Sequence, residues 1–348
     1  MQTSTTDTSS NASHSSQRIP LLALVGPTAS GKTALALALA DLAPAALGLR
    51  GAEIISADSR QIYRLMTIAT AKPTADEQAR VRHHLLDVVW PDQSYTLAEY
   101  QRDAQAAISN VWARGHLPLL VGGTGLYVRA VVDGLAIPEV APQPELRAKL
   151  EAEAARSGPG ALLERLRSLD PVAAARIDAR NPRRLIRALE VCIVSGRPFS
   201  EQQGRRPTPY STVMVGLSVP REALFARADA RISAMLADGL VAETEALVAR
   251  GYDWSLPAMS SLGYREIGAY LRGENTLAEA ITRFEQATHA YIRRQVTWFR
   301  PDKRIHWLDA SLPPSTLVEQ ANLAVLSALA SARGAASAPP IAHEIAPE

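Results

Sequence analysis

A run of eight residues near the amino terminus has the composition and spacing of a phosphate-binding loop. It matches the pattern G-x-x-x-x-G-K-[ST] without a gap and consists of Gly26, Pro27, Thr28, Ala29, Ser30, Gly31, Lys32 and Thr33. The glycines of such a loop let backbone N–H groups turn inward on an anion, and the helix behind it adds the positive end of its dipole. We expect Lys32 to contact the terminal phosphates of a ligand and Thr33 to hold Mg²⁺.

Two further polar side chains follow apolar runs and are candidates for the same site. Asp58 comes directly after residues 52–57, and Thr124 follows residues 117–121 within the sequence GGTGLY. If both runs are parallel strands, their carboxyl ends meet at one edge of the sheet, where ligands bind. Taken singly, Asp58 also suits a helix N-cap and Thr124 a turn hydroxyl. The neighbouring phosphate loop favours a functional role for both.

One feature of ordinary P-loop nucleotidases is missing from the sequence. Such enzymes carry an Asp on the Mg²⁺ side, at the end of a core strand. No carboxylate follows residues 117–121. The motif therefore predicts a phosphate site and leaves open which phosphate compound occupies it.

The elements that must position these residues alternate along the chain. Apolar runs at 19–25, 52–57 and 117–121 predict strands, and helical patterns lie between them, notably at 97–114. This alternation predicts an α/β fold, a P-loop NTPase-like parallel sheet core with a helical insertion domain.

The character of the sequence changes after Leu135. A Pro-rich segment leads into a wholly helical stretch that ends near Gly204, and one of its helices has Asn181 and Pro182 as N-cap and first residue. A strand pattern returns at 213–219. We therefore predict five segments: a disordered tail at 1–17, the first part of the core at 18–136, a helical insertion at 137–206, a second and largely helical part of the core at 207–312, and a C-terminal helix and tail at 313–348.

Composition limits the class of protein. The chain has 348 residues, of which 47% are hydrophobic, which is ample for a buried core. A single cysteine, Cys192, excludes an internal disulfide and a cysteine-rich zinc site. No apolar run is long enough to span a bilayer, and residues 1–17 carry neither Arg nor Lys, unlike a signal or transit peptide. We expect a soluble cytoplasmic protein without membrane contact, and nothing in the sequence demands more than a monomer.

Basic residues are mostly Arg and gather in two clusters. Of the 37 basic residues 33 are Arg, which suits phosphate and base contacts, although a GC-rich genome would produce the same bias. Residues 176–206 carry eight Arg against three acids. Residues 283–304 carry six basic residues against two acids, interleaved with Tyr291, Trp298 and Phe299. Aromatic side chains beside Arg suit single-stranded RNA. We interpret His83, His84 and Asp87 as structural residues and not as a metal site.

The sequence resembles the tRNA dimethylallyltransferases, also called tRNA isopentenyltransferases. The matching blocks keep the order of that family and cover about residues 18–310. They are GPTASGKT (26–33), ISADSRQIY (55–63), ATAKPT (69–74), HHLLD (83–87), LLVGGTGLY (119–127), DPVAAARIDARNPRRLIRALEV (170–191), SSLGYREI (260–267) and RRQVTWFR (293–300).

The resemblance implies that the loop holds the diphosphate of dimethylallyl diphosphate. The dimethylallyl group would pass to the exocyclic amine of the adenosine just 3′ of the anticodon in tRNA. Asp58 matches the general base of the family, Thr124 a residue beside the reacting groups, and Arg231 an Arg that contacts the diphosphate together with Lys32 and Mg²⁺. The same resemblance and the clusters imply tRNA anticodon stem-loop contacts from Asp58, Ser59, Arg60, Gln61, Arg147, Arg183, Arg184, Leu185, Ile186, Arg187, Ser260, Ser261, Leu262, Gly263, Tyr264, Arg265, Arg293, Arg294, Gln295, Val296, Thr297, Trp298, Phe299 and Arg300.

Three other functions remain open from the sequence. A P-loop nucleotide kinase would use the insertion as a lid over a small acceptor. A nucleotide-gated RNA-binding protein would bind without group transfer. Prenyl transfer to free adenine nucleotides would keep the chemistry, but a small nucleotide does not need so basic an insertion.

Overall fold

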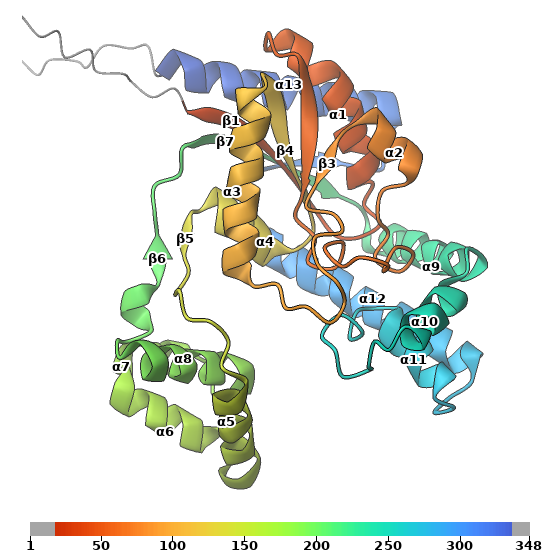
Figure 1. Ribbon diagram of the computed structural model, residues 1–348. Helices are drawn as coiled ribbons and strands as arrows, with labels where there is room; N and C mark the ends of the chain where they lie inside the picture. Colours follow the sequence, from red (N-terminus) through yellow and green to blue (C-terminus); the bar gives the residue numbers. More distant parts are fainter. Residues whose placement is uncertain (1–17, 336–348) are drawn as a thin grey trace, which may run out of the picture.

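The core of the protein is a six-stranded parallel sheet (Figure 1). The computed structural model describes residues 18–335. The strands lie in the order β3-β2-β4-β1-β7-β8. Their bounds are Ile19–Val25 for β1, Gly51–Ser56 for β2, His83–His84 for β3, His116–Gly122 for β4, Tyr210–Ser218 for β7 and Ile305–Asp309 for β8. Because every neighbouring pair is parallel, the carboxyl ends of the strands share one edge.

Helices cover both faces of this sheet, so its central strands are apolar on both sides. Leu22 and Leu24 of β1 face a cluster with α1 (Lys32–Ala46) and α13 (Pro314–Ala335). Leu21 and Ala23 point the other way, toward α3 (Leu97–Ala113) and α4 (Gly125–Val132). The alternation follows from the two-residue period of a strand. A short helix, α2 (Ala75–Arg80), lies between β2 and β3 along the chain.

A separate group of helices lies between β4 and β7 along the chain (Figure 1). It contains α5 (Pro144–Ser157), α6 (Pro159–Leu169), α7 (Pro171–Arg176), α8 (Pro182–Ser195) and the 3-10 helix η1 (Ser200–Gln202). The antiparallel pair of β5 (Leu135–Ala136) and β6 (Gly204–Arg205) joins the group to the core. The helices pack on a hydrophobic cluster of their own, which includes Leu162, Leu166 and Leu189.

Helix α8 shows how local sequence sets these boundaries. The side chain of Asn181 accepts a hydrogen bond from the N–H of Arg184 at 3.2 Å, and Pro182 occupies the first turn. Gly196 ends the helix in the left-handed conformation, with φ of 67°. Apolar residues then bury one side of the helix inside the cluster.

The remaining helices follow β7 and extend below the carboxyl edge of the sheet (Figure 1). They are α9 (Arg221–Ala237), α10 (Leu240–Ala249), α11 (Tyr264–Leu271) and α12 (Leu277–Phe299). The carboxylate of Glu243 in α10 accepts the N–H groups of Thr67 and Ile68, and the hydroxyl of Tyr264 donates to it. These bonds tie the helices to the long connection between β2 and β3. Within residues 18–335, no helix combines the length and apolarity needed to cross a membrane.

Candidate active site

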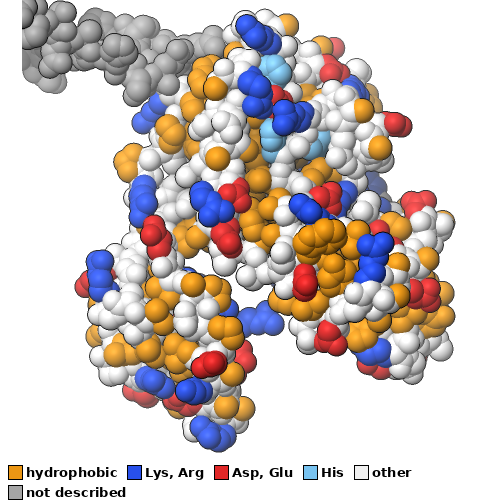
Figure 2. Space-filling view, viewed as in Figure 1, with side chains coloured by type: hydrophobic (Ala, Val, Ile, Leu, Met, Phe, Trp, Pro, Cys, Tyr) orange, Lys and Arg blue, Asp and Glu red, His pale blue; other side chains and the backbone are white. Residues whose placement is uncertain are grey.

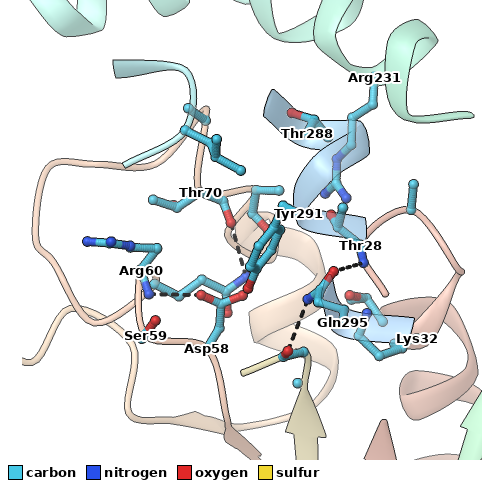
Figure 3. Close-up of a pocket in the computed structure, with 18 of the residues that line it drawn as sticks. Thr28, Lys32, Asp58, Ser59, Arg60, Thr70, Arg231, Thr288, Tyr291 and Gln295 are labelled. Carbon is cyan, nitrogen blue, oxygen red and sulfur yellow. Dashed lines mark hydrogen bonds between the residues drawn. The ribbon is translucent and has the colours of Figure 1, made fainter. Parts of the chain in front are cut away.

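A cavity of about 820 Å³ lies at the carboxyl edge of the sheet. It is lined by the phosphate loop, the segment after β2, the loop after β4, and the facing sides of α9 and α12 (Figure 3). In the space-filling view, a hollow separates the helices α5–α8 from the helices α9–α12, and basic side chains stand at its margin (Figure 2). Arg183 at the start of α8 reaches this cavity, so the helical insertion contributes to its wall.

The phosphate loop has the backbone that an anion-binding turn requires. Gly26 and Gly31 have positive φ values of 148° and 93°, and Ala29 adopts φ of 61°. A Cβ on Gly26 would lie 3.3 Å from the carbonyl oxygen of Leu217, so a larger residue would also crowd β7. Helix α1 starts immediately after the loop, at Lys32. The loop therefore presents the positive end of a buried helix to the cavity.

Lys32 is the central cation at the end of the cavity that the phosphate loop forms. Its Nζ donates to the carbonyl oxygen of Pro27 at 2.6 Å. Burial lowers the pKa of Lys32 to about 8, Asp58 opposes this shift, and Arg231 adds to it. The three charges are thus close enough to influence one another. A second cation beside a buried ammonium group is costly unless an anion lies between them, which is what a bound diphosphate would supply.

Asp58 lines the other side of the cavity, and Thr124 contacts the segment that carries it. Asp58 Oδ1 accepts the N–H of Arg60 at 2.8 Å, whereas Oδ2 accepts no hydrogen bond from any described residue. Thr124 Oγ1 accepts the N–H of Ser59 at 3.1 Å. A Cβ on Gly122 would lie 2.2 Å from the carbonyl oxygen of Ala57, so the two segments are in direct contact. The free oxygen of Asp58 is available to take a proton.

Tyr291 of α12 completes this side. Its side chain faces the cavity and lies near Asp58 (Figure 3). Burial raises the pKa of Tyr291 to about 12, and the charge of Asp58 acts in the same direction. The phenol therefore stays neutral at physiological pH and can serve as a hydrogen-bond donor or acceptor.

The segment after β2 is rigidly supported. Gln61 Oε1 accepts the hydroxyl of Ser56 at 3.0 Å, and its Nε2 donates to the carbonyl oxygen of Ala71 at 3.0 Å.

The side chains of the HHLLD block have partners inside the protein. His84 Nε2 lies 2.7 Å from Glu53, and Lys72 Nζ lies 2.7 Å from Asp87 Oδ1. The His83, His84 and Asp87 side chains thus have internal partners, and no described residues form a His, Cys, Asp and Glu cluster able to hold a metal.

The cavity brings together about half of the residues for which RNA contact was expected. Besides Asp58 these are Ser59, Arg60, Gln61, Arg183, Ser260, Ser261, Leu262, Arg265, Arg294 and Gln295. The other expected residues lie outside its lining. Among them Arg184, Arg293, Thr297, Trp298 and Arg300 are exposed, and Gly263 and Val296 are not. The RNA-contact assignments therefore remain predictions for each of these positions.

Several residues that were expected to contact RNA are instead buried in the protein or paired with another side chain. Leu185, Ile186, Tyr264 and Phe299 are at most 5% exposed and belong to hydrophobic clusters, so their side chains cannot touch RNA in this conformation. Two expected Arg side chains face inward for a different reason, namely an ion pair with the fully buried Glu190. Arg147 Nε lies 2.7 Å from Glu190 Oε1, and Arg187 NH1 lies 2.7 Å from Oε2. Their guanidinium groups are engaged by the protein itself.

Arg227 and Thr288 are among the residues of the cavity wall that the sequence did not predict. Arg227 stands one turn before Arg231 on α9, and Thr288 stands on the face of α12 that carries Tyr291 and Gln295. The spacing of four between the two Arg residues is a signal that could have found the first, because it places both on one helix face. No local pattern distinguishes Thr288.

Comparison with known proteins gives consistent results. A family model described as IPP transferase matches residues 61–302. A tRNA dimethylallyltransferase of Roseiflexus castenholzii is 54% identical over 295 residues, which cover 85% of this chain and 94% of that protein. A tRNA dimethylallyltransferase of Chloroflexus aggregans is 57% identical over 280 residues, covering 80% and 92%.

Solved structures agree. A tRNA isopentenylpyrophosphate transferase from Bacillus halodurans superposes with a TM-score of 0.68 at 36% identity, covering 91% of this chain and 98% of that one. A eukaryotic dimethylallyltransferase, solved in a study of its action on tRNA, superposes with a TM-score of 0.75 and covers 90% and 80%. At 24% identity this second likeness concerns the fold alone.

Proposed function

Because the chain belongs to the IPP transferase family, we propose that it transfers the dimethylallyl group of dimethylallyl diphosphate to a tRNA. The acceptor is the exocyclic amine of the adenosine 3′-adjacent to the anticodon, and diphosphate is released. One observation carries this assignment within the site. The unpaired oxygen of Asp58 lies in the same cavity as a phosphate loop, and no carboxylate follows β4 to aim water at a phosphate.

The chemistry requires the two reactants to be held in line. The lone pair of an adenine amine is delocalised into the ring, so the amine is a poor nucleophile unless it loses a proton as it attacks. The nitrogen forms a bond to the allylic carbon, the bond from that carbon to the diphosphate oxygen breaks, and its electron pair leaves with the diphosphate. Asp58 Oδ2 takes the amine proton. Thr124 and Tyr291 orient the amine.

The leaving diphosphate gains negative charge as its bond to carbon breaks. Lys32, Arg231 and the N–H groups of the phosphate loop stabilise this charge. A Mg²⁺ ion suits the same place, because it prefers phosphate oxygens, water and one or two protein oxygens to an all-protein cage. The exposed hydroxyl of Thr33 at the start of α1 would hold it, and the ion would supply further charge neutralisation.

The acceptor side of the cavity fits a nucleic acid better than a free nucleotide. Arg60, Arg183, Arg265 and Arg294 line it, and they come from four different segments of the chain. A base that reacts in such a cavity must leave its stack, and a ring of Arg around the opening would bind the phosphates on either side.

The direct test incubates the protein and Mg²⁺ with labelled dimethylallyl diphosphate and unmodified tRNA that has adenosine after the anticodon. A parallel reaction contains free adenine nucleotides. We expect label in the RNA. Label in the free nucleotides alone would assign the same chemistry to a smaller acceptor, and label in neither would refute prenyl transfer.

A further inference from the structure

Gln295 is a buried polar residue on α12 whose two amide ends serve different loops. Its side chain is 5% exposed in total and faces the cavity. Oε1 accepts the N–H of Thr28 at 2.9 Å, and Nε2 donates to the carbonyl oxygen of Gly123 at 3.0 Å. Both bonds are drawn in Figure 3. Each end of the amide therefore has a partner within the protein, and the residue is too buried to offer much surface to RNA.

The two loops that meet at Gln295 are those that carry the two halves of the site. Thr28 lies inside the phosphate loop, where the donor diphosphate is expected. Gly123 directly precedes Thr124, whose hydroxyl is hydrogen-bonded to Ser59 beside Asp58. A single side chain from a third, distant segment therefore connects the donor end of the cavity with the acceptor end.

The contact between Gln295 and the loop after β4 is tight enough to fix the distance between this loop and the phosphate loop. A Cβ on Gly123 would lie 2.2 Å from Gln295 Nε2 and 3.2 Å from the carbonyl oxygen of Gly26. Only glycine allows the two loops and the amide to approach so closely. Strands β1 and β4 are paired as far as Val25 and Gly122, and beyond that point the Gln295 amide bridges the two loops. Displacement of the side chain would remove this bridge and let the loops shift relative to one another.

Helix α12 itself is firmly anchored. Phe284 packs in the cluster of α9–α11, Ile292 packs against α9, and Phe299 packs in the core beneath the sheet. The three residues are 3%, 1% and 3% exposed. The amide of Gln295 therefore projects from a rigid element, which is what a precise spacer requires.

We propose that Gln295 is a positioning residue that sets the separation between the phosphate loop and the Thr124 loop. This inference rests on the proposed function, because the separation matters only if a group passes from one loop to the other. In-line attack needs the reacting atoms about 3–3.5 Å apart, and a misplacement of about 1 Å costs about 100-fold in rate.

The test replaces the amide and keeps the rest of the helix. Gln295→Met retains the length of the side chain and removes both hydrogen bonds, and Gln295→Asn keeps the amide but is one methylene too short to reach both loops. Gln286→Met is the matched control, since Gln286 is exposed on the same helix. Single-turnover transfer to tRNA gives the rate constant, and titrations give the dissociation constants of inorganic diphosphate and tRNA.

We expect the rate constant to fall about 100-fold in Gln295→Met and less in Gln295→Asn, with both dissociation constants within about threefold of wild type. A merely structural defect would lower the amount of active enzyme and leave the single-turnover rate constant unchanged. A wild-type rate constant in Gln295→Met overturns the inference, and if that variant does not fold, Gln295→Asn decides in the same way. A wild-type protein that labels no RNA would instead refute the proposed function.

Discussion

The affinity for dimethylallyl diphosphate should depend on pH through Lys32. Burial lowers the pKa of this ammonium group to about 8 in the free protein. A bound diphosphate beside it favours the protonated form and raises the pKa again. Below pH 8 Lys32 is already charged when the ligand arrives. Above pH 8 a proton must be taken up on binding, and affinity falls as the pH rises.

The size of the effect follows from the fraction of protonated Lys32. With a pKa of about 8, about nine tenths of the protein carries the charge at pH 7 and about one tenth at pH 9. The dissociation constant should therefore rise about tenfold between these pH values. The ligand itself contributes little, because the last ionisation of a phosphate ester has a pKa near 6 and is about nine tenths complete at pH 7.

Calorimetric titrations of the donor at pH 7, 8 and 9 measure this directly. Lys32→Arg is the control, because a guanidinium group does not titrate in this range and its affinity should stay level. Asp58→Asn should move the fall in affinity to lower pH, because Asp58 raises the pKa of Lys32. An equal slope in wild type and Lys32→Arg would show that Lys32 does not face the diphosphate.

Three further predictions concern the base, the RNA surface and the helical insertion. Asp58→Asn should lower single-turnover transfer at least about 100-fold while tRNA binding survives in a filter assay; equal losses of both would contradict the role of base. Replacing Arg183 and Arg184, both exposed at the start of α8, by Ala should weaken tRNA binding and reduce its salt slope by about 1.5, and an unaltered slope would exclude phosphate contacts there. Burial would raise the pKa of Glu190, but its hydrogen-bond partners, Arg147 first among them, lower this pKa to about 2. The ionised carboxylate therefore contributes about 3 kcal/mol to the free energy of unfolding. This contribution is present above about pH 4.5 and is lost as the pH falls toward 2. Glu190→Gln should therefore destabilise helices α5–α8 by a similar amount near pH 7 in hydrogen exchange, and unchanged protection there would contradict it.

The strands and helices with clear local signals could be predicted from the sequence. The predicted strand at 19–25 is β1, and the predicted helix at 97–114 is α3, one residue shorter. The edge strands β3 and β8 were not predicted. β8 has the sequence IHWLD, whose side chains are mostly exposed, and only its pairing with β7 makes it a strand. An edge strand with so little buried surface has no alternating pattern to detect.

The candidate site was predictable where residues lie close together in the sequence. The phosphate loop and Asp58 follow strands, and topology brings them to one edge. The role of Gln295 depends on Thr28 and Gly123, which lie 267 and 172 residues away in the sequence. The Glu190 that Arg187 contacts also pairs with Arg147, 43 residues away from it. Arg187 carries the charge expected of an RNA contact, yet the same charge also serves the buried Glu190 that Arg147 pairs with. Composition cannot distinguish these two uses of an Arg side chain.

The position of the transferred group in the RNA tests the central claim most directly. An anticodon stem-loop with adenosine after the anticodon would be incubated with the protein and dimethylallyl diphosphate, cut into oligonucleotides with a ribonuclease and sequenced by tandem mass spectrometry, beside a stem-loop with guanosine at that position. We predict one dimethylallyl group on the exocyclic amine of that adenosine and none in the guanosine control. Modification at other adenosines, or equal labelling of both stem-loops, would contradict the account.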